Sequence, residues 1–207
     1  MTQWRRLPQR AGQFVGSRVT GLRLAVHTLR AYDPPPANAF AEFGEGSFLV
    51  PPARVDHPEC IHVGRSVILN EHVWLAIDPR PGRPAPVLRL GDGTIFNRFV
   101  KIECAGSVTI GEGVLVADRA VITDTDLPPV ATDVGPFPDP AAEPRPVVIA
   151  DRVFLGAGSV VKAGVTIGEH AYVSANSVVT RDVPPRTLVV GAPARAVRTW
   201  EEGDVHG

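Results

Sequence analysis

Aliphatic side chains recur at every sixth position near the end of this chain. Each step of six from position 149 to position 179 reaches isoleucine, leucine or valine, and the positions four residues further on are small or β-branched. Glycine, alanine, aspartate and asparagine lie between them, as tight turns require. A sustained period of six predicts short strands separated by corners. The first set is Ile149, Leu155, Val161, Ile167, Val173 and Val179, and the second is Val153, Ser159, Val165, Ala171, Ser177 and Val183.

The same period runs upstream with interruptions. The interval from Ile102 to Ile110 holds two residues too many, which we expect to bulge, and longer interruptions cover 79–86 and 124–146. Three hexads, about 18 residues, can close one triangular coil, and stacked coils align their aliphatic side chains in ladders. A β-sandwich is disfavoured because its strands recur every 8–12 residues or so. The upstream aliphatic positions are Val63, Leu69, Leu75, Leu90, Phe96, Ile102, Ile110, Val116 and Ile122.

Composition excludes several other classes of protein. The chain has 207 residues, 44% of them hydrophobic and 21% charged, which argues against wholesale disorder. A formal net charge of −1 does not favour a nucleic-acid-binding protein. We find neither an apolar run that could span a membrane nor the apolar core of a signal peptide. With only Cys60 and Cys104, we expect a reduced, cytoplasmic protein.

The termini differ from the repeat. We expect residues 1–43 to form an amphipathic helix from Ser17 to Ala31 and a proline-rich linker, followed by the repeat at 44–198 and a flexible tail at 199–207. The helix carries arginines and no acid, and it fits a cap on the open end of the solenoid. A basic helix that binds anionic lipid or a partner is the alternative.

The segment VIADRVFLGAGSVVKAGVTIGEHAYVSANSVVTRDVPPRTLVVGAPARAVR, residues 148–198, resembles the hexapeptide-repeat acyltransferase superfamily. It is similar to the last coils of sugar O-acetyltransferases from polysaccharide and natural-product clusters. The resemblance covers about residues 44–198 and implies an all-β, left-handed parallel β-helix. It also implies a homotrimer with acyl-CoA in the groove between adjacent helices, and a small-molecule acceptor.

The resemblance departs at the residue that would carry the chemistry. In the resembled enzymes a histidine in the loop after the middle coils acts as the base, and Leu127 stands at that position here. No histidine lies between His72 and His170. Asp124 or Asp126 could serve as base or orienting group, or an amine acceptor could dispense with a base. In a third interpretation the scaffold has lost acyl transfer and binds another ligand or catalyses another reaction near loop 124–146. Two further candidates on the middle coils are Asn97 and Glu103.

Residues near the C-terminal end match positions where the superfamily binds CoA. Small side chains would let the pantetheine arm lie along the backbone, and guanidinium groups suit its phosphates. The same small residues also serve as ordinary corners. The CoA candidates are Ala157, Gly158, Ala175, Asn176, Arg181, Ala192 and Arg195.

The other reactive side chains have more ordinary interpretations. His57 and His62 have the spacing of a zinc pair in hexapeptide-repeat carbonic anhydrases, but no suitable third histidine precedes them, so we expect no metal site. His72 occupies a corner and is expected to be solvated. Cys104 is expected to point inward, with no histidine placed to activate it.

Overall fold

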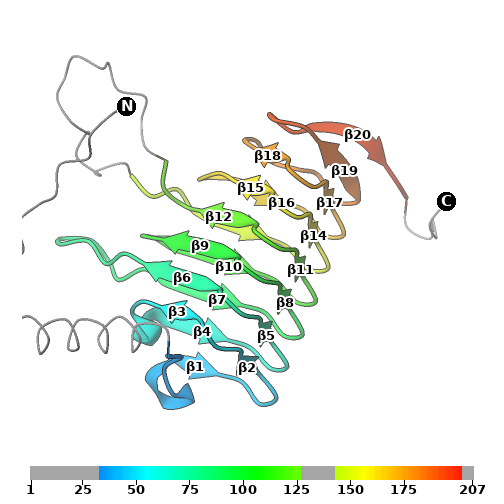
Figure 1. Ribbon diagram of the computed structural model, residues 1–207. Coiled ribbons are helices and arrows are strands. Elements are labelled where there is room, and N and C mark those ends of the chain that lie inside the picture. Colours follow the sequence, from blue (N-terminus) through cyan, green and yellow to red (C-terminus); the bar gives the residue numbers. More distant parts are fainter. Residues whose placement is uncertain (1–32, 127–142, 202–207) are drawn as a thin grey trace, which may run out of the picture.

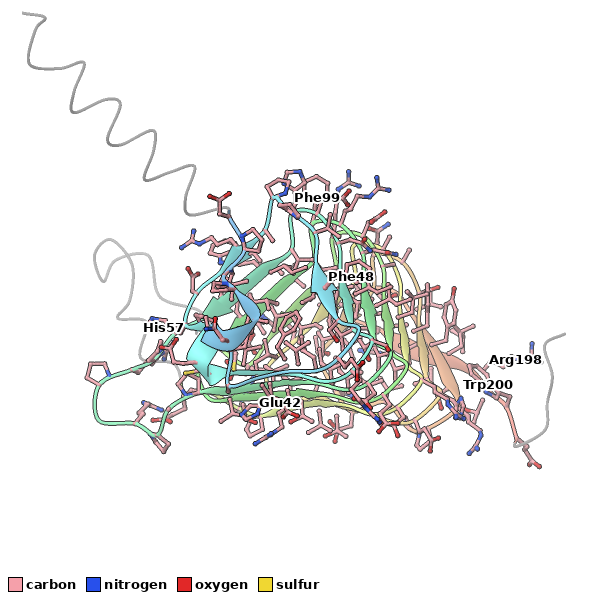
Figure 2. The ribbon with its side chains drawn as sticks, turned by 90° about the horizontal axis from the view of Figure 1, so that it is seen from below. Glu42, Phe48, His57, Phe99, Arg198 and Trp200 are labelled. Atoms are coloured by element: carbon pink, nitrogen blue, oxygen red, sulfur yellow. The ribbon has the colours of Figure 1, made fainter. Side chains whose placement is uncertain are left out.

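The computed structural model describes residues 33–126 and 143–201. Their strands form three sheets that wrap around one axis as a triangular prism (Figures 1 and 2). Successive strands enter sheets A, B and C in turn, so three strands complete one coil. Each strand pairs in parallel with the corresponding strand of the neighbouring coil. The predicted left-handed parallel β-helix is confirmed. The expected helical cap at Ser17–Ala31 lies outside the described residues.

Each sheet stacks one short strand from every coil. Sheet A contains β1 (Glu42–Phe43), β4 (Ile61–Val63), β7 (Val87–Leu90), β10 (Ser107–Ile110), β13 (Val147–Ile149) and β16 (Thr166–Ile167). Sheet B contains β2 (Phe48–Leu49), β5 (Ile68–Leu69), β8 (Ile95–Phe96), β11 (Leu115–Val116), β14 (Phe154–Leu155), β17 (Tyr172–Val173), β19 (Thr187–Val190) and β20 (Arg195–Thr199). Sheet C contains β3 (Arg54–Val55), β6 (Trp74–Ile77), β9 (Lys101–Cys104), β12 (Val121–Thr123), β15 (Val160–Val161) and β18 (Val178–Val179).

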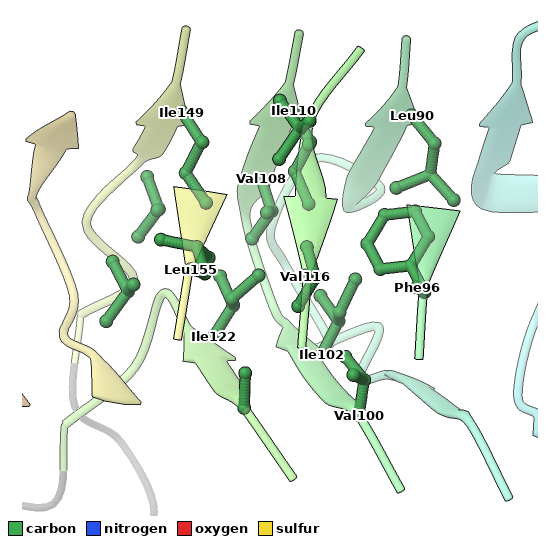
Figure 3. Close-up of a cluster of buried hydrophobic side chains, with 14 of the residues drawn as sticks. Leu90, Phe96, Val100, Ile102, Val108, Ile110, Val116, Ile122, Ile149 and Leu155 are labelled. Atoms are coloured by element: carbon green, nitrogen blue, oxygen red, sulfur yellow. The ribbon is translucent and has the colours of Figure 1, made fainter. Parts of the chain in front are cut away.

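The period of six places one aliphatic side chain inside the prism on each side. Leu90 pairs with Ile110, and Ile110 pairs with Ile149, so these side chains form one ladder along the core (Figure 3). Every aliphatic position named above is buried, none more than 5% exposed. Burial of about 25 cal/mol per Å² of apolar surface in these ladders supplies the main driving force for coil stacking.

The interruptions lengthen strands as well as loops. The two extra residues between Ile102 and Ile110 do not simply bulge, because β9 continues through the buried Cys104 and the corner forms at Ala105 and Gly106. The last strand ends at Thr199, the first residue of the expected tail, and residues 202–207 of that tail lie outside the described residues. Two 3₁₀ turns, Ala37–Ala39 and Pro58–Cys60, are the helical elements of the described residues, and neither is long enough to cross a bilayer.

The edge between sheets B and C, which we call the B–C corner, places one residue of each coil after the first in the left-handed conformation. The five residues, with φ between 57° and 66°, are His72, Phe99, Arg119, Gly158 and Asn176. The backbone N–H of each one from Phe99 onward bonds the carbonyl of the coil below, at 2.8–3.2 Å. These residues therefore stack as a column, and Phe99 stands at its corner in the view along the prism (Figure 2).

Candidate functional site

A cleft lies on the outer face of sheet C, where its strands reach the edge shared with sheet A. Strand register aligns Ala76 with Glu103 and Glu103 with Thr123. The cleft has a volume of about 410 Å³, and its polar lining includes Asp56, Asp78, Arg80, Glu103, Thr125 and Asp126. The fold thus brings together two of the four predicted catalytic residues, Glu103 and Asp126.

Both of these carboxylates are held by cations but remain partly accessible. Glu103 lies 2.5 Å from the Lys101 ammonium, and 41% of its side chain is exposed. Asp126 contacts Arg145 at 2.8 Å and pairs with Lys162 from β15, leaving 26% of its side chain exposed. Such pairs fix the direction of a carboxylate, which is what an acceptor-binding group needs.

Asp124 is placed differently. Its fully buried carboxylate accepts the backbone N–H groups of Ala105 at 2.9 and 3.1 Å, Gly106 at 2.7 Å and Ser107 at 2.9 Å. The hydroxyl of Thr125 donates to it as well, at 3.1 Å. Because these donors occupy its oxygens, Asp124 joins the long loop to the corner of the coil below. We therefore assign it a structural role in place of the base role that the sequence suggested.

Asn97 does not reach the cleft. It follows β8 at the B–C corner, and its side-chain oxygen accepts a hydrogen bond from the Asn70 amide at 3.3 Å. The cleft lies at the opposite edge of sheet C, beyond Glu103. Within one protomer, the structure separates Asn97 from the other catalytic candidates.

Cys104 lines the cleft but is suited to the core. It is 1% exposed, and its Sγ donates weakly to the Val87 carbonyl at 3.6 Å. Burial, reinforced by the nearby Asp124 carboxylate, raises the pKa of the Cys104 thiol to about 12. The thiolate that a nucleophile requires is therefore strongly disfavoured.

The predicted CoA residues lie on the last coils. Gly158 and Asn176 occupy the B–C corner, and a Cβ on Gly158 would come within 2.6 Å of the Asn176 side-chain oxygen. Ala157 and Ala175 precede them and are exposed, as are Arg181, Ala192 and Arg195. Arg195 begins β20 and donates to the Ala194 carbonyl at 2.9 Å.

The described residues contain no group of three side chains that could hold a metal ion. His57 instead contacts Glu59 at 3.0 Å, and His62 lies 3.6 Å from Glu42 on the outer face of sheet A.

Sequence reasoning missed the cationic and aromatic part of this face. Trp74 lies between the Arg54 guanidinium, 4.5 Å from its ring centre, and the Lys101 ammonium, at 4.2 Å. The Trp74 indole N–H also donates to Asp56 at 2.9 Å. Alternation along β6 and β9 could have placed Trp74 and Lys101 on the outer face. The partners Arg145 and Lys162 of Asp126 depend on coil stacking and carry no local signal.

The repeat is also recognised by comparison with known proteins. The family model described as "Bacterial transferase hexapeptide (six repeats)" matches residues 146–181. Residues 146–181 of this chain therefore match a hexapeptide repeat. The chain resembles the sugar O-acetyltransferases that share this repeat.

Two curated relatives come from Escherichia coli K12. The galactoside O-acetyltransferase is 28% identical over 167 residues, which cover 81% of this chain and 68% of the relative. A lipopolysaccharide biosynthesis O-acetyl transferase, WbbJ, is 33% identical over 55% of this chain, and the match spans less than two thirds, 61%, of that relative.

Among solved structures, a variant of AntD, an N-acyltransferase from Bacillus cereus in complex with dTDP and coenzyme A, has a TM-score of 0.68. It is 19% identical, and the match covers 79% of this chain and 86% of that chain, which supports the shared fold.

Proposed function

We propose that this chain is an acyl-CoA-dependent acyltransferase that acts on a hydroxyl or amine of a sugar or natural-product intermediate. The observation that carries the proposal is the cleft in which Glu103 and Asp126 meet, beside the long loop between β12 and β13. Carboxylates accept hydrogen bonds from sugar hydroxyls and ammonium groups, so the cleft suits a polar acceptor. The O-acetyltransferase names of the two E. coli relatives support the reaction class.

In this proposal the cleft residues bind and orient the acceptor. Transfer forms a C–O or C–N bond and breaks the thioester C–S bond. Asp126, fixed by Arg145 and Lys162, and Glu103, fixed by Lys101, would accept hydrogen bonds from the acceptor. Holding the acceptor in one orientation contributes to the rate because it removes an entropic part of the barrier.

Acyl-CoA is the proposed co-substrate, and it would supply the acyl group as an activated thioester. The small residues at the last coils of the B–C corner leave the backbone accessible to a pantetheine arm. The exposed arginines beyond them would pair with the phosphates. The residues we propose for this role are those predicted above, Ala157, Gly158, Ala175, Asn176, Arg181, Ala192 and Arg195.

A homotrimer fits the outer face of sheet B, which carries an apolar ladder. Register aligns one outward side chain from each strand β2, β5, β8, β11, β14, β17 and β19, and all seven are apolar or aromatic. A contiguous apolar surface of this kind marks a protein interface. A groove between protomers would expose Asn97 to the neighbouring chain. The ladder consists of Phe48, Ile68, Ile95, Leu115, Phe154, Tyr172 and Leu188.

We place the protein in the cytoplasm, where acyl-CoA is available. Cys60 and Cys104 are both free thiols, as a reducing compartment favours.

The second candidate is a scaffold that has lost acyl transfer and binds a different ligand or catalyses another reaction near loop 124–146. The engagement of Asp124 in backbone hydrogen bonds favours it, because this removes one of the two carboxylates proposed to replace the missing histidine. Leu127 and most of that loop lie outside the described residues.

Calorimetric titration with CoA and acetyl-CoA separates the two candidates. We expect micromolar binding to the intact protein, weakened about tenfold by Arg181→Ala or Arg195→Ala, since each removes a charge-assisted phosphate contact. Arg89→Ala, on the outer face of sheet A, is the control and should bind normally. An absence of binding at millimolar CoA would reject the transferase and favour the repurposed scaffold.

A further inference from the structure

Three of the B–C corner residues, His72, Phe99 and Arg119, carry large side chains in the left-handed conformation. His72 has φ of 63° and Phe99 has φ of 61°, in the left-handed region that glycine and asparagine occupy at low cost. The last coils place Gly158 and Asn176 at the equivalent positions. A large side chain in this conformation costs about 1–2 kcal/mol per residue. Other corners also place large residues in this conformation, namely Arg152, His170 and Arg186, so the contact between the His72 and Phe99 rings is what sets this pair apart.

The two side chains form one rigid unit at the surface. The His72 imidazole lies flat on the Phe99 ring, with centroids 4.6 Å apart and planes inclined by 2°. The Arg119 guanidinium lies 5.9 Å from the Phe99 ring centre. Both rings are exposed, Phe99 by 50%. Stacking therefore fixes the imidazole without burying it.

His72 also differs from the other histidines of the described residues. His57, His62 and His170 each lie within 3.0–3.6 Å of a glutamate oxygen. Within the described part of the chain, the ring nitrogens of His72 have no hydrogen-bond or ion-pair partner. An imidazole with a fixed plane and an open nitrogen is suited to accept a proton from a substrate.

The column places this pair in line with Gly158 and Asn176, two of the proposed CoA residues. Coils stack about 4.8 Å apart, so Phe99 lies two coils, about 10 Å, from Gly158 along the corner. The side chains change from small at Asn176 and Gly158 to large at Arg119 and Phe99. An arm that follows the small corner residues, with its phosphates near Arg195, would bring its thioester end to the large ones.

We propose that the His72–Phe99 pair receives the thioester end of acyl-CoA and that His72 is the general base of the transfer. The cleft and the B–C corner of one chain lie at opposite edges of sheet C, so in the proposed trimer His72 would act on the acceptor held in the cleft of a neighbouring chain. The imidazole takes the proton of the acceptor O–H or N–H as the acceptor atom bonds to the thioester carbonyl carbon. The C–S bond then breaks, and the imidazolium returns its proton to the departing thiolate, giving CoA and neutral His72. Phe99 is a positioning residue that holds the imidazole plane. This inference rests on the proposed function and supplies the base that Leu127 cannot provide.

Protection from chemical modification tests where the thioester end lies. The intact protein is treated with diethyl pyrocarbonate, and carbethoxylation of His72 and His170 is followed by peptide mass spectrometry. We expect CoA to slow modification of His72 at least fivefold and to leave His170, a corner histidine of the other edge of sheet B, unchanged. Adenosine 3′,5′-bisphosphate, which lacks the arm, should protect neither.

The outcomes separate this inference from the function on which it rests. CoA that binds by calorimetry without protecting His72, or equal protection by the bisphosphate, overturns the inference and leaves the acyltransferase standing. No CoA binding overturns both.

Steady-state kinetics test the proton transfer itself. Release of CoA from acetyl-CoA is measured with water alone as the acceptor and with methyl β-galactoside added. We expect His72→Gln to lower kcat about 10²–10⁴-fold while changing CoA affinity far less than it changes kcat, and Phe99→Leu to lower kcat less. His170→Gln should have no effect. A His72→Gln variant that turns over at the rate of the unmodified chain would contradict the base assignment.

Discussion

At the residue scale, the long loop is tied to the helix through one buried carboxylate. Asp124 accepts three backbone N–H groups from the coil below, so its charge is compensated by oriented donors instead of a cation. Hydrogen bonds to a charged group contribute about 1.5–3 kcal/mol each, and unmet buried donors are costly. The side chain that sequence spacing suggested as a base is thus the anchor of the cleft wall.

Asp124→Asn should therefore destabilise the fold. An amide retains one acceptor oxygen and turns a donor toward backbone N–H groups, so we expect the free energy of unfolding to fall by about 2–4 kcal/mol. Urea unfolding followed by circular dichroism measures this loss. The matched control is Asp126→Asn, whose partly exposed side chain should cost less than about 1 kcal/mol. Equal stability of the two variants would remove the structural role of Asp124.

Cys104 gives a second test at this scale. Because burial raises the pKa of its thiol to about 12, only about one thiol in 10⁴ is ionised at pH 8. We expect Ellman's reagent to modify only the half-buried Cys60 in the folded protein and both thiols in guanidinium. Burial also raises the pKa of Cys60, which should react more slowly than a free thiol. Fast reaction of Cys104 in the native state would contradict its place in the core.

The sign of the Cys104 contribution to stability follows from the same shift. The unfolded thiol ionises near pH 8.5, while the folded thiol keeps its proton. The unfolded state is therefore favoured as the pH rises from about 9 toward 12, and the contribution of Cys104 to the free energy of unfolding is lost over that range.

At the scale of the strands, the coils stack closely enough to exclude side chains at certain corners. A Cβ on Gly91 would lie 2.4 Å from the backbone carbonyl of Gly111, whereas one on Gly93, in the same corner, would meet no atom within 4 Å. We expect Gly91→Ala to cost at least about 2 kcal/mol, because the backbone must shift. Gly93→Ala should cost about 1 kcal/mol, from its φ of 67° alone. Thermal unfolding at one protein concentration compares them, and similar melting temperatures would contradict this packing.

The hexad period predicted the strands because it can be seen within a few residues of sequence and because only one arrangement places every sixth aliphatic side chain inside the prism. Every sixth position from Ile149 to Val179 is buried, and the upstream ladders follow the same rule. The candidate site was harder to predict because its contacts join different coils. Glu103 and Asp126 share a cleft only after β9 and β12 stack, and the roles of Asp124 and Asn97 depend on which backbone donors and edges they meet. The spacing of residues along the chain does not predict those contacts.

At the scale of the whole molecule, the three outer faces differ in chemistry. Sheet C carries the cleft and the Trp74 cluster, and the aligned outward positions of sheet A include Glu42, His62 and Arg89. Sheet B carries the apolar ladder, in which the Phe154 and Tyr172 rings stack with centroids 4.5 Å apart. Its outer face meets the B–C corner, where we place the CoA arm and His72. An interface on sheet B would therefore lie next to the proposed active groove.

The apolar ladder leads to a prediction on assembly. Leu115 lies at the centre of the ladder, between Ile95 and Phe154, and Leu115→Glu would place a charge inside the interface. We expect light scattering to give about 66 kDa for the unmodified protein, as three chains of 22.1 kDa, and about 22 kDa for the variant. Thr109→Glu, on the outer face of sheet A, is the control and should remain trimeric.

The same variant tests whether the groove between protomers forms the CoA site. If it does, Leu115→Glu should lose CoA affinity together with its assembly, while its circular dichroism stays unchanged because the core ladders are intact. A monomeric unmodified protein, or a variant that stays trimeric, would reject the ladder as the interface. A monomeric variant that binds CoA with full affinity would instead place the whole CoA site on one chain, along its own B–C corner.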